Sequence, residues 1–583
     1  MSIEIRYTLA MPQPETHRFH VRVEVDAWQL AQAELVLPAW TPGSYLIREF
    51  ARHIEHFRAE TLAGTPLPWQ RVNKAMWQIE TNNVNGFRIQ YEVYANELTV
   101  RTSHLDSTHG YFNGTNLFMY VDGFKQHPVT LAIEEPPGWH TSIALPQNEQ
   151  GHYEAVTYDI LADSPGEIGT HRVLHFEALG KPHEVALWGH GNENESVLVQ
   201  DLKRVVEYVA KMFCNQLPYE RYLFIVHLGD QIRGGLEHRD STTLAVDRWT
   251  FFPSREYEKF VRLAIHEFFH TWNVKRIRPS NLGPFDYTQE AYTPLLWVME
   301  GFTSYYDYLI QCRSGFISPK RYLQVLQERI ATYLKQPGRL IQSLEESSLT
   351  TWIKFYRKDE NYINSGISYY LKGSFVALML DFHLRIESGN EKTLDDVMRY
   401  LWHLYGTRDV GFSEDEFYDA VEGVGEIDID PFLERFVRGV EELPLAEYFA
   451  FVGLELTSGH KSDTPKAWLG LNLQSKSEEI VIKNVLRDSP AEIAGLMAKD
   501  RLIAIDGYEI RDKTFLNARL REKAPDDKAS FHLLRNGLLL KKEVTLTKTP
   551  PDYVSLRPQK DATIPQRELL EAWLATSWEN VAK

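Results

Sequence analysis

The sequence predicts a multidomain α+β protein: an N-terminal antiparallel β domain, a mostly α-helical middle domain and a small β-rich C-terminal domain. The chain has 583 residues, more than one hydrophobic core usually organises, so several domains are expected. Apolar and polar side chains alternate through about the first 165 residues, and from about residue 196 the apolar ones recur with helical spacing. A polar stretch at 456–466 is typical of a linker before a last compact part.

The N-terminal domain, residues 1–165, is predicted from its period-two runs. Residues 3–7, 19–25 and 87–94 alternate apolar and polar side chains, as half-buried strands do. Turn-forming segments such as Thr41-Pro42-Gly43 separate these runs. Strands with one buried face are typical of an antiparallel sheet.

The middle domain, residues 166–455, is predicted to be rich in helices, with one clear strand at 222–227. A helix is expected to start near Pro294, with Thr293 as its N-cap, and to run through Cys312. The other helical patterns lie at 201–213, 256–274, 319–335, 367–387, 394–405 and 413–422.

The C-terminal domain, residues 456–549, carries two local signals. Ser489-Pro490 should cap a short helix, and Asp506-Gly507 should form a hairpin turn. The remaining residues, 550–583, form a tail with a short amphipathic helix expected at about 566–579.

Composition restricts the partners and the location. A formal charge of −17 argues against nucleic acid and against anionic membrane surfaces, because both repel acidic proteins. Cys214 and Cys312 are too few for a disulfide framework, so both are expected to be reduced. The N-terminus enters a strand pattern without a signal peptide, and no uncharged run approaches about 18 residues. These features predict a cytoplasmic protein without a membrane span, and they leave the oligomeric state open.

The most informative motif is His266-Glu267-Phe268-Phe269-His270, an H-E-x-x-H pattern in an amphipathic helical run. Positions i and i+4 share one helix face, so both imidazoles can bind one metal ion. Glu267 would lie beside that metal, placed to take a proton from a bound water. The alternative is a helix with two partly buried, hydrogen-bonded histidines and no metal.

A catalytic zinc ion needs a third protein ligand. Sites with three histidines place the third one six residues after the second, where this chain has Arg276. A carboxylate remains, and Glu290 and Glu300 are the candidates. Glu300 is favoured because a helix holds a ligand more rigidly than the loop expected around Glu290. Side chains on the same helix face could support the ligands: Thr303, Ser304 and Asp307.

Residues 266–279 and 296–306 resemble the M61 glycyl aminopeptidase family, a relative of the M1 aminopeptidases among the gluzincins. Residues 37–45 are also similar to that family, so the matches span nearly the whole chain. The resemblance implies a thermolysin-like zinc peptidase domain with one Zn²⁺ per chain. It also implies removal of small N-terminal residues, Gly or Ala, from peptides.

Residues Gly234-Gly235-Leu236-Glu237-His238 are similar to the G-x-M-E-N segment of M1 enzymes. This implies that Gly234 and Gly235 lie on a strand edge that pairs with the peptide. It also implies that Glu237 binds the free α-amine. Leu236 and His238 depart from the pattern. The alternative for Glu237 is an acidic strand-end residue in solvent.

Residues Tyr370-Leu371-Lys372-Gly373 resemble the Y-x-K-G segment of M1 enzymes. This implies that the Tyr370 hydroxyl stabilises the oxyanion of the tetrahedral intermediate. The alternative is that Tyr370 and the adjacent Tyr369 are both core aromatics.

Residues 466–548 resemble a PDZ domain. The resemblance implies that the loop Leu469-Gly470-Leu471 offers N–H groups to a peptide C-terminal carboxylate, while the peptide adds a strand. A PDZ domain that only packs on the catalytic domain is an equal alternative.

Together these patterns predict a zinc aminopeptidase acting on peptides. His266, His270 and Glu300 would hold the zinc that polarises the scissile carbonyl, and Glu267 would move a proton from water to the leaving amine. A zinc endopeptidase with PDZ-guided substrate recognition is the first alternative. A non-catalytic peptide-binding scaffold is the second, although binding alone would not require Glu267.

Overall fold

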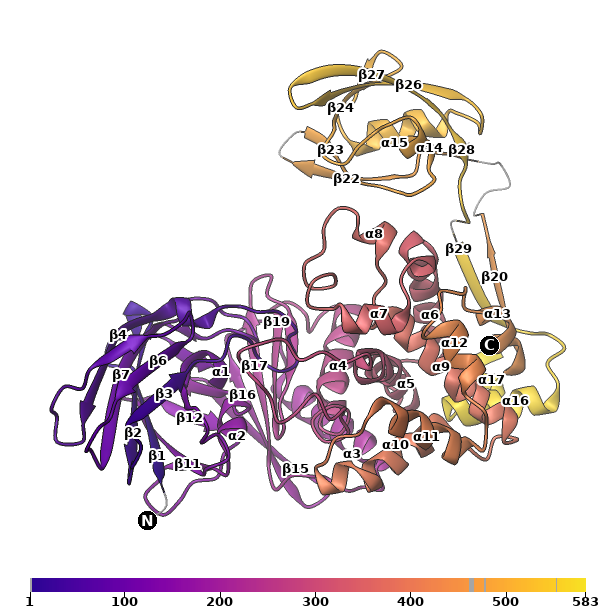
Figure 1. Cartoon of the computed structure of the whole chain (residues 1–583). Coiled ribbons are helices and arrows are strands. Elements are labelled where there is room, and N and C mark those ends of the chain that lie inside the picture. Colours follow the sequence, from indigo (N-terminus) through magenta and orange to yellow (C-terminus); the bar gives the residue numbers. More distant parts are fainter. Residues whose placement is uncertain (1–2, 461–465, 477–478, 552, 583) are drawn as a thin grey trace. The chain divides into compact units, whose positions relative to one another are not determined.

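The computed structural model describes residues 3–460, 466–476, 479–551 and 553–582 (Figure 1). The predicted fold class is confirmed: a β-rich N-terminal domain, a helical middle part and a small β-rich C-terminal domain. The chain divides into two compact units. The first contains Met1–Thr293, Tyr306–Phe316 and Asp395–Ala420, and the second contains Pro294–Tyr305, Ile317–Leu394 and Val421–Lys583.

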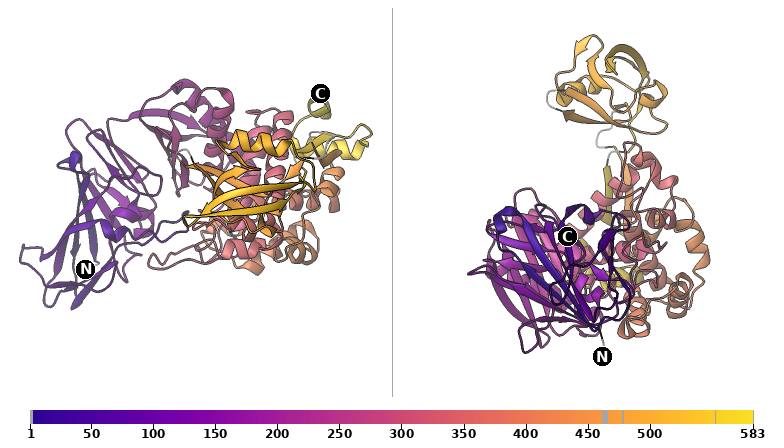
Figure 2. Two further views of the ribbon diagram at one scale, coloured as in Figure 1. Left: turned by 90° about the horizontal axis from the view of Figure 1, so that it is seen from above. Right: turned by 60° about the vertical axis from the view of Figure 1, so that its left-hand side comes forward.

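Six strands form the largest sheet of the N-terminal domain, in the order β13-β11-β1-β2-β7-β4. The strands of this domain are indigo to purple in Figure 2. Neighbouring strands pair antiparallel, as predicted, except that β1 and β11 are parallel. The chain passes through other strands before it reaches β11, so no hairpin joins this pair. Alternate side chains of β1, β2 and β7 enter the core of the domain. The bounds are β1 Glu4–Ala10, β2 Arg18–Asp26, β4 Ile54–Thr61, β7 Gly86–Tyr94, β11 Val129–Glu134 and β13 Tyr153–Ala155.

Two four-stranded sheets complete this domain, in the orders β10-β3-β6-β5 and β12-β14-β9-β8. The first comprises β3 Gln32–Val36, β5 Trp69–Arg71, β6 Met76–Glu80 and β10 Tyr120–Val121. The second comprises β8 His104–Leu105, β9 His109–Phe112, β12 His140–Ile143 and β14 Gly166–Gly169. Short helices lie between the strands: α1 Gly114–Leu117, α2 Tyr158–Ala162 and the 3₁₀ turns η1 Pro14–Thr16 and η2 Phe50–His53.

A five-stranded sheet follows in the first unit, in the order β15-β16-β17-β19-β18. Strand β18 lies at its edge and runs antiparallel to β19, whereas β16, β17 and β19 are mutually parallel. Helix α4 contacts both β18 and β19, so this edge is placed beside the H-E-x-x-H motif. The bounds are β15 Arg172–Ala178, β16 Lys181–Trp188, β17 Tyr222–Gly229, β18 Gly234–Glu237, β19 Ser241–Asp247, α3 Glu195–Met212 and α4 Ser254–Phe269.

Helix α4 ends earlier than predicted, at Phe269 instead of residue 274. The ring of His270 bonds the Asn273 carbonyl oxygen through Nδ1, at 2.5 Å. Arg276 Nη1 donates to the Thr271 carbonyl at 2.9 Å. In a continuing helix both carbonyls would accept main-chain N–H groups, so these side chains end it.

The helix expected from Pro294 begins instead at Trp297, and the prediction that Thr293 caps it is wrong. The Trp297 N–H donates to Ser348 Oγ at 3.0 Å, so the cap comes from a residue distant in sequence. Its first part, η3 Trp297–Phe302, is a π-helix that continues directly as α5 Thr303–Arg313. The Thr303 hydroxyl donates to the Met299 carbonyl at 2.6 Å, the acceptor that an α-helix would give to the Thr303 N–H.

The other predicted helices are present, with some ends shifted by a few residues. They are α6 Pro319–Leu334, α9 Leu371–Glu387, α10 Leu394–Leu404 and α11 Glu414–Gly425, together with α3. The pattern analysis missed several short helices: η4 Pro337–Leu340, α7 Leu344–Leu349, α8 Tyr362–Ser365, η5 Gly406–Arg408, α12 Asp430–Phe436 and α13 Leu445–Phe451.

The C-terminal domain is a sheet in the order β22-β23-β24-β26-β27, with β25 paired to β24. The Ser489 side chain accepts the Glu492 N–H and caps α14, as predicted. Asp506 and Gly507 have φ of 50° and 86°, the geometry of the predicted hairpin turn. The bounds are β21 Ala467–Trp468, β22 Leu471–Lys476, β23 Glu479–Val485, α14 Pro490–Ile493, β24 Arg501–Ile505, β25 Tyr508–Glu509, α15 Lys513–Arg521, β26 Lys528–Arg535, β27 Leu538–Thr545 and β28 Thr547–Lys548.

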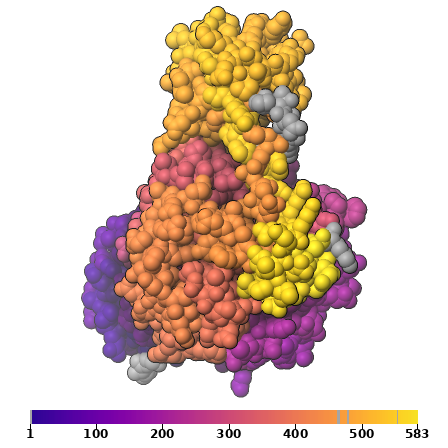
Figure 3. All heavy atoms as spheres, turned by 90° about the vertical axis from the view of Figure 1, so that its right-hand side faces the viewer, coloured from indigo at the N-terminus to yellow at the C-terminus, as the bar shows by residue number. Residues whose placement is uncertain are grey.

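The tail returns to the helical part of the second unit. Strand β29 Tyr553–Pro558 pairs antiparallel with β20 Leu454–Gly459, so the first residues of the expected linker form a strand, and 461–465 lie outside the described residues. The single predicted tail helix is two, α16 Ile564–Leu574 and α17 Trp578–Ala582, because the chain turns at Ala575 with φ 52°. These helices (yellow in Figure 3) contact α13 and α6. Across the described ranges, no helix combines the length and apolarity needed to cross a membrane.

Candidate metal centre and peptide-binding edge

His266 and His270 present their rings on one face of α4 and its C-terminal end. The ring centroids are 4.8 Å apart, and both residues are buried. His266 bonds Asp307 Oδ2 through Nδ1 at 2.9 Å, and His270 uses Nδ1 for the Asn273 carbonyl. With both Nδ1 atoms engaged, Nε2 is the nitrogen through which each ring would bind a metal.

Asp307, on α5, is one of the three residues expected to support the metal ligands. It is fully buried, and its Oδ2 accepts from Arg262 Nη1 at 2.8 Å as well as contacting His266. The positive charge of Arg262 offsets the negative charge of the buried Asp307 carboxylate. This carboxylate can therefore hold the His266 imidazole in one tautomer. Thr303 has a different role, since its hydroxyl stabilises the π-turn.

Glu267 lies against the edge strand β18. A Cβ atom at Gly235 would stand 2.0 Å from Glu267 Oε1 and 2.4 Å from its Cδ. Only glycine leaves room for this carboxylate at that place in the strand. Glu267, His270 and Glu237 form a buried group whose ligand atoms all lie within 4.8 Å of one another.

Glu237 ends strand β18 and is 4% exposed, so the alternative of a solvent-exposed acid is wrong. Gly43, with φ +83°, covers it: a Cβ there would lie 2.6 Å from Glu237 Oε1. The turn at Thr41-Pro42-Gly43 therefore closes over this carboxylate, a role that sequence reasoning missed. A cavity of about 400 Å³ reaches the same carboxylate, and its lining includes Pro42, Gly43, Tyr45, Lys275 and Tyr287.

The two departures from the G-x-M-E-N pattern have structural explanations. Leu236 is buried in a small cluster with Val100 and Ala245. His238 bonds Asp163 Oδ1 through Nδ1 at 3.0 Å. Neither residue is therefore needed to explain the position of Glu237.

The second unit carries Glu300 and Tyr370. Glu300 lies on η3, is 4% exposed, and accepts a hydrogen bond from the Tyr370 hydroxyl at 2.8 Å. Burial and the Glu300 charge raise the pKa of Tyr370 well above its usual value, so its hydroxyl stays protonated. Tyr369 is instead fully buried, and its hydroxyl accepts from Thr351 Oγ1 at 3.0 Å. Tyr369 therefore fits the core-aromatic alternative, whereas Tyr370 is half-buried, stacks on Phe355 with ring centroids 5.6 Å apart and bonds Glu300.

Two glycines bring η3 and α9 together. A Cβ at Gly301 would stand 2.8 Å from the Gly373 backbone, and one at Gly373 would stand 3.0 Å from the Gly301 Cα. The backbones therefore touch without side chains between them. This contact sets the spacing at which Tyr370 reaches Glu300.

One continuous helical run carries Glu300 and Asp307, because η3 is followed directly by α5. His266, His270 and Glu300 are a buried group that could hold a metal ion. Two imidazoles and one carboxylate suit zinc, and they leave a position for water or substrate. Glu290 is half-buried in a loop and belongs to no such group among the described residues.

The expected peptide loop of the C-terminal domain precedes β22. Leu469 is buried, and Gly470 has φ +78° and packs against Ser489, where a Cβ would approach to 2.2 Å. Leu471 opens β22, which stands at the end of its sheet. Within the second unit, the Asn364 and Asn484 amides join the end of β23 to the segment around α8, at 2.8 and 2.6 Å. The domain thus has a packing contact and also an edge strand.

A second buried cluster, missed by sequence reasoning, ties the N-terminal domain to the following sheet. Glu167 on β14 bonds His109 of β9 at 2.7 Å and His227 of β17 at 2.8 Å. All three side chains are fully buried. Burial opposes ionisation of Glu167, but the two histidines overcome it and lower the pKa of Glu167 to about 2. These distances are those of hydrogen bonds, and burial lowers the pKa of His227, so the cluster is a buried hydrogen-bonded connection between the sheets.

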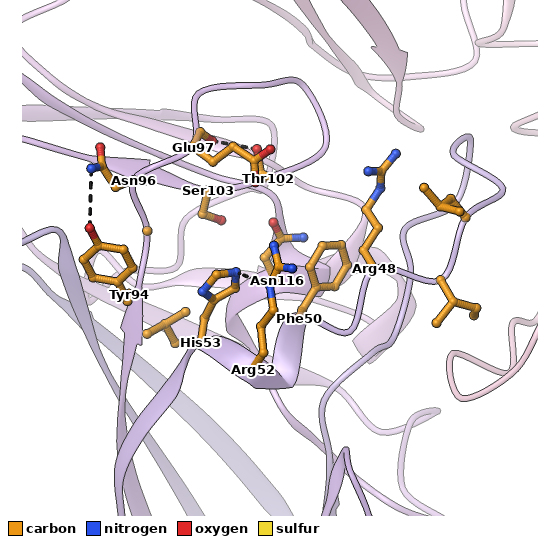
Figure 4. A pocket seen from close by; sticks show the side chains of 14 residues that line it. Arg48, Phe50, Arg52, His53, Tyr94, Asn96, Glu97, Thr102, Ser103 and Asn116 are labelled. Carbon is orange, nitrogen blue, oxygen red and sulfur yellow. Dashed lines mark hydrogen bonds between the residues drawn. The ribbon is translucent and has the colours of Figure 1, made fainter. Parts of the chain in front are cut away.

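Another cavity, of about 320 Å³, lies in the N-terminal domain (Figure 4). Its lining includes Arg48, Arg52, His53, Glu97 and Ser103, and it contains none of the predicted site residues. The loop that carries Glu97 and Ser103 leads into β8, and its Val100 packs against Leu236 of strand β18.

Comparison with known proteins shows which family the chain belongs to. The family model of the Peptidase M61 N-terminal domain matches residues 6–170, that of the M61 glycyl aminopeptidase matches 259–376, and that of a PDZ domain matches 467–546. The crystal structure of an aminopeptidase N family protein from Idiomarina loihiensis is 32% identical, with a TM-score of 0.91 over 98% of this chain and 100% of that one. The chain belongs to the M61 glycyl aminopeptidase family. Membership assigns it to the zinc metallopeptidases of the aminopeptidase class.

Two further proteins are similar to parts of this M61 chain. An M1 zinc metallopeptidase from Deinococcus radiodurans is 14% identical, with a TM-score of 0.48 over 76% of this chain and 94% of that one. A carboxyl-terminal-processing protease of Synechocystis sp. is 33% identical over 91 residues, which are 15% of this chain. The match spans 21% of that protease.

Proposed function

We propose that this M61 enzyme is a zinc-dependent aminopeptidase that hydrolyses the first peptide bond of peptides with a free N-terminus. The observation that carries the proposal is the buried group formed by Glu237, Glu267 and His270 at the edge of β18. A carboxylate beside the base can hold an α-ammonium group one residue away from the scissile bond. An endopeptidase binds no α-ammonium group at that position, so a buried negative charge there would lack a partner in the substrate.

His266, His270 and Glu300 are the proposed ligands of one zinc ion. When bound, zinc supplies Lewis-acid chemistry: it polarises the scissile carbonyl and lowers the pKa of the attacking water. Asp307 holds the His266 ring in the tautomer that binds through Nε2.

Glu267 acts as the general base and then as the general acid. Its carboxylate takes a proton from the attacking water and gives it to the nitrogen of the departing peptide. Gly235 leaves the space that this carboxylate occupies. Glu237 meanwhile holds the α-ammonium group, and β18 pairs with the peptide backbone at Gly234 and Gly235.

Tyr370 is the proposed donor to the oxyanion. Its raised pKa keeps the hydroxyl protonated, and without substrate that proton is shared with Glu300. As charge develops on the carbonyl oxygen, the hydroxyl donates to it, an interaction worth about 3 kcal/mol in comparable sites.

A preference for Gly or Ala at the N-terminus is part of the proposal, and the glycyl aminopeptidase family model supports it. The test is a panel of amino-acid amides and their N-acetylated forms, assayed with chelator and after zinc is restored. We expect the free glycyl and alanyl amides to be hydrolysed fastest, acetylation to abolish turnover, and zinc to restore what chelation removes. Acetylated substrates cleaved as fast as free ones would favour the endopeptidase alternative.

The PDZ domain is proposed to bind a peptide C-terminus at Leu469-Gly470-Leu471 and along β22. The PDZ family match and the edge position of β22 support this. Fluorescence polarisation of labelled peptides with the full chain tests it. Saturable binding of free-acid peptides and not of their amides is expected, whereas no binding above background would favour a packing role.

A further inference from the structure

We propose that Arg101 binds the C-terminal carboxylate of the substrate, so that the preferred substrates are short peptides with a free C-terminus. This inference rests on the proposed aminopeptidase function, because it concerns the other end of the same bound peptide. Such a site would select peptides by their free C-terminal carboxylate and by their length.

The first observation is that the Arg101 side chain lies beside Gly234, the first residue of the edge strand β18. Arg101 Nη1 lies 3.6 Å from the place that a Cβ of Gly234 would occupy. A peptide whose amine meets Glu237 and whose scissile bond faces Glu267 runs antiparallel to β18, toward Gly234. Arg101 therefore stands where the departing part of the peptide leaves the strand edge.

The spacing along β18 sets the length of the peptide. Gly234 lies three residues before Glu237, which in a strand is a distance of about 10 Å. An extended tripeptide spans about 10 Å and a dipeptide about 7 Å. A tripeptide thus brings its carboxylate to Gly234. A dipeptide ends about 3 Å short of Gly234, a distance that the long Arg101 side chain can span.

The charge of Arg101 is the second observation. The side chain is half-buried, and its buried Nε has no hydrogen-bond partner in the described ranges. No carboxylate of those ranges forms an ion pair with its guanidinium group, unlike most half-buried arginines of this domain, such as Arg18 and Arg88. A carboxylate ligand would satisfy the guanidinium with two parallel hydrogen bonds.

The loop that carries Arg101 is held firmly against β18. Thr102 Oγ1 donates to the Glu97 carbonyl at 2.6 Å, a bond drawn in Figure 4, and lies 2.7 Å from Thr99 Oγ1. The Arg101 N–H donates to Thr99 Oγ1 at 3.2 Å. Val100, fully buried, packs with Leu236 of the strand itself. The guanidinium is therefore presented from a fixed backbone, as a binding residue requires.

The faces of the strand are compatible with this arrangement. Gly235 and Glu237 point to one face, and Gly234 points to the other, where Val100 and Arg101 lie. The α-carboxylate at the end of a peptide paired with β18 lies in the plane of the sheet. It can be reached from either face, whereas a side chain could be reached from only one.

The test compares Gly-Ala-Ala with its C-terminal amide, using the full-length zinc-loaded enzyme and measuring released glycine. We expect wild-type kcat/KM to favour the free acid by about 10- to 100-fold, the range for a hydrogen bond to a charged group. Arg101→Gln should lose this preference through a higher KM for the acid, while turnover of the amide stays unchanged. Arg101→Lys, which keeps the charge but not the fork, should retain part of it.

Arg233→Gln is the matched control, because Arg233 is an exposed arginine next to Gly234 in the sequence and its removal changes the net charge by the same amount. It should keep the wild-type preference. Equal kcat/KM for acid and amide in the wild type would overturn the inference and leave the aminopeptidase function standing. Loss of preference in Arg233→Gln as well as in Arg101→Gln would also overturn it. If the wild type released glycine from neither substrate, the proposed function itself would fail.

Discussion

Replacing Gly235 by alanine should damage catalysis without touching any group that reacts. The new Cβ would lie 2.0 Å from Glu267 Oε1, and ordinary contact begins near 3.4 Å. The carboxylate must therefore withdraw by more than about 1 Å, or the strand must move away from α4 by as much. A displacement of that size costs about 100-fold in rate where a reacting group must be held in place.

The assay is steady-state hydrolysis of glycyl amide by G235A, with zinc content measured by mass spectrometry and Tm by circular dichroism. We expect kcat to fall about 100-fold with one zinc still bound, because His266 and His270 are not displaced. G43A is the informative comparison, since its Cβ meets Glu237 instead. It should mainly raise KM for substrates with a free amine. Wild-type kcat in a folded, zinc-loaded G235A would refute the placement of Glu267 as the base.

Four further outcomes are expected. Glu267→Gln should bind zinc as the wild type does yet lose nearly all turnover, so retained turnover would exclude Glu267 as the base. Tyr370→Phe should lower kcat by about 100- to 1,000-fold with little change in KM, and an equal effect of Tyr369→Phe would count against the assignment. Asp307→Asn should weaken zinc about 10- to 100-fold in a chelator competition; unchanged affinity would remove its supporting role. Glu167→Gln should destabilise the fold by about 3 kcal/mol at pH 7 in urea unfolding. Because the folded pKa of Glu167 is lowered to about 2 from 4.5, this contribution is present above pH 4.5 and is lost as the pH falls toward 2. A difference between E167Q and wild type that does not shrink over that range would contradict the stabilisation of ionised Glu167 by its two histidine partners.

Much of the site could be predicted because its residues lie close together in the sequence. H-E-x-x-H needs only helical periodicity to bring two imidazoles to one face, and the early end of α4 leaves that face intact. Ser489 and the Asp506-Gly507 turn act on their immediate neighbours, so local chemistry sufficed for them too.

Features that depend on distant residues could not be predicted. The helix carrying Glu300 starts at Trp297 because Ser348 caps it, and no local pattern contains that residue. The parallel pairing of β1 with β11 depends on a connection of more than a hundred residues. The burial of Glu237 depends on Gly43, nearly two hundred residues earlier in the chain. A glycine is common in turns of every kind, so Gly43 alone does not indicate this contact. The domain boundaries at 165, 455 and 549 remain predictions.

We propose that Glu237 makes this zinc hydrolase an aminopeptidase. The most direct measurement is the ratio of kcat/KM for glycyl p-nitroanilide to that for its N-acetylated form, in zinc-loaded wild type and E237Q. We expect a ratio of about 100 or more in the wild type, which falls toward unity in E237Q because the α-ammonium loses a charge-assisted hydrogen bond. A ratio near one in the wild type, or an undiminished ratio in E237Q, would contradict it.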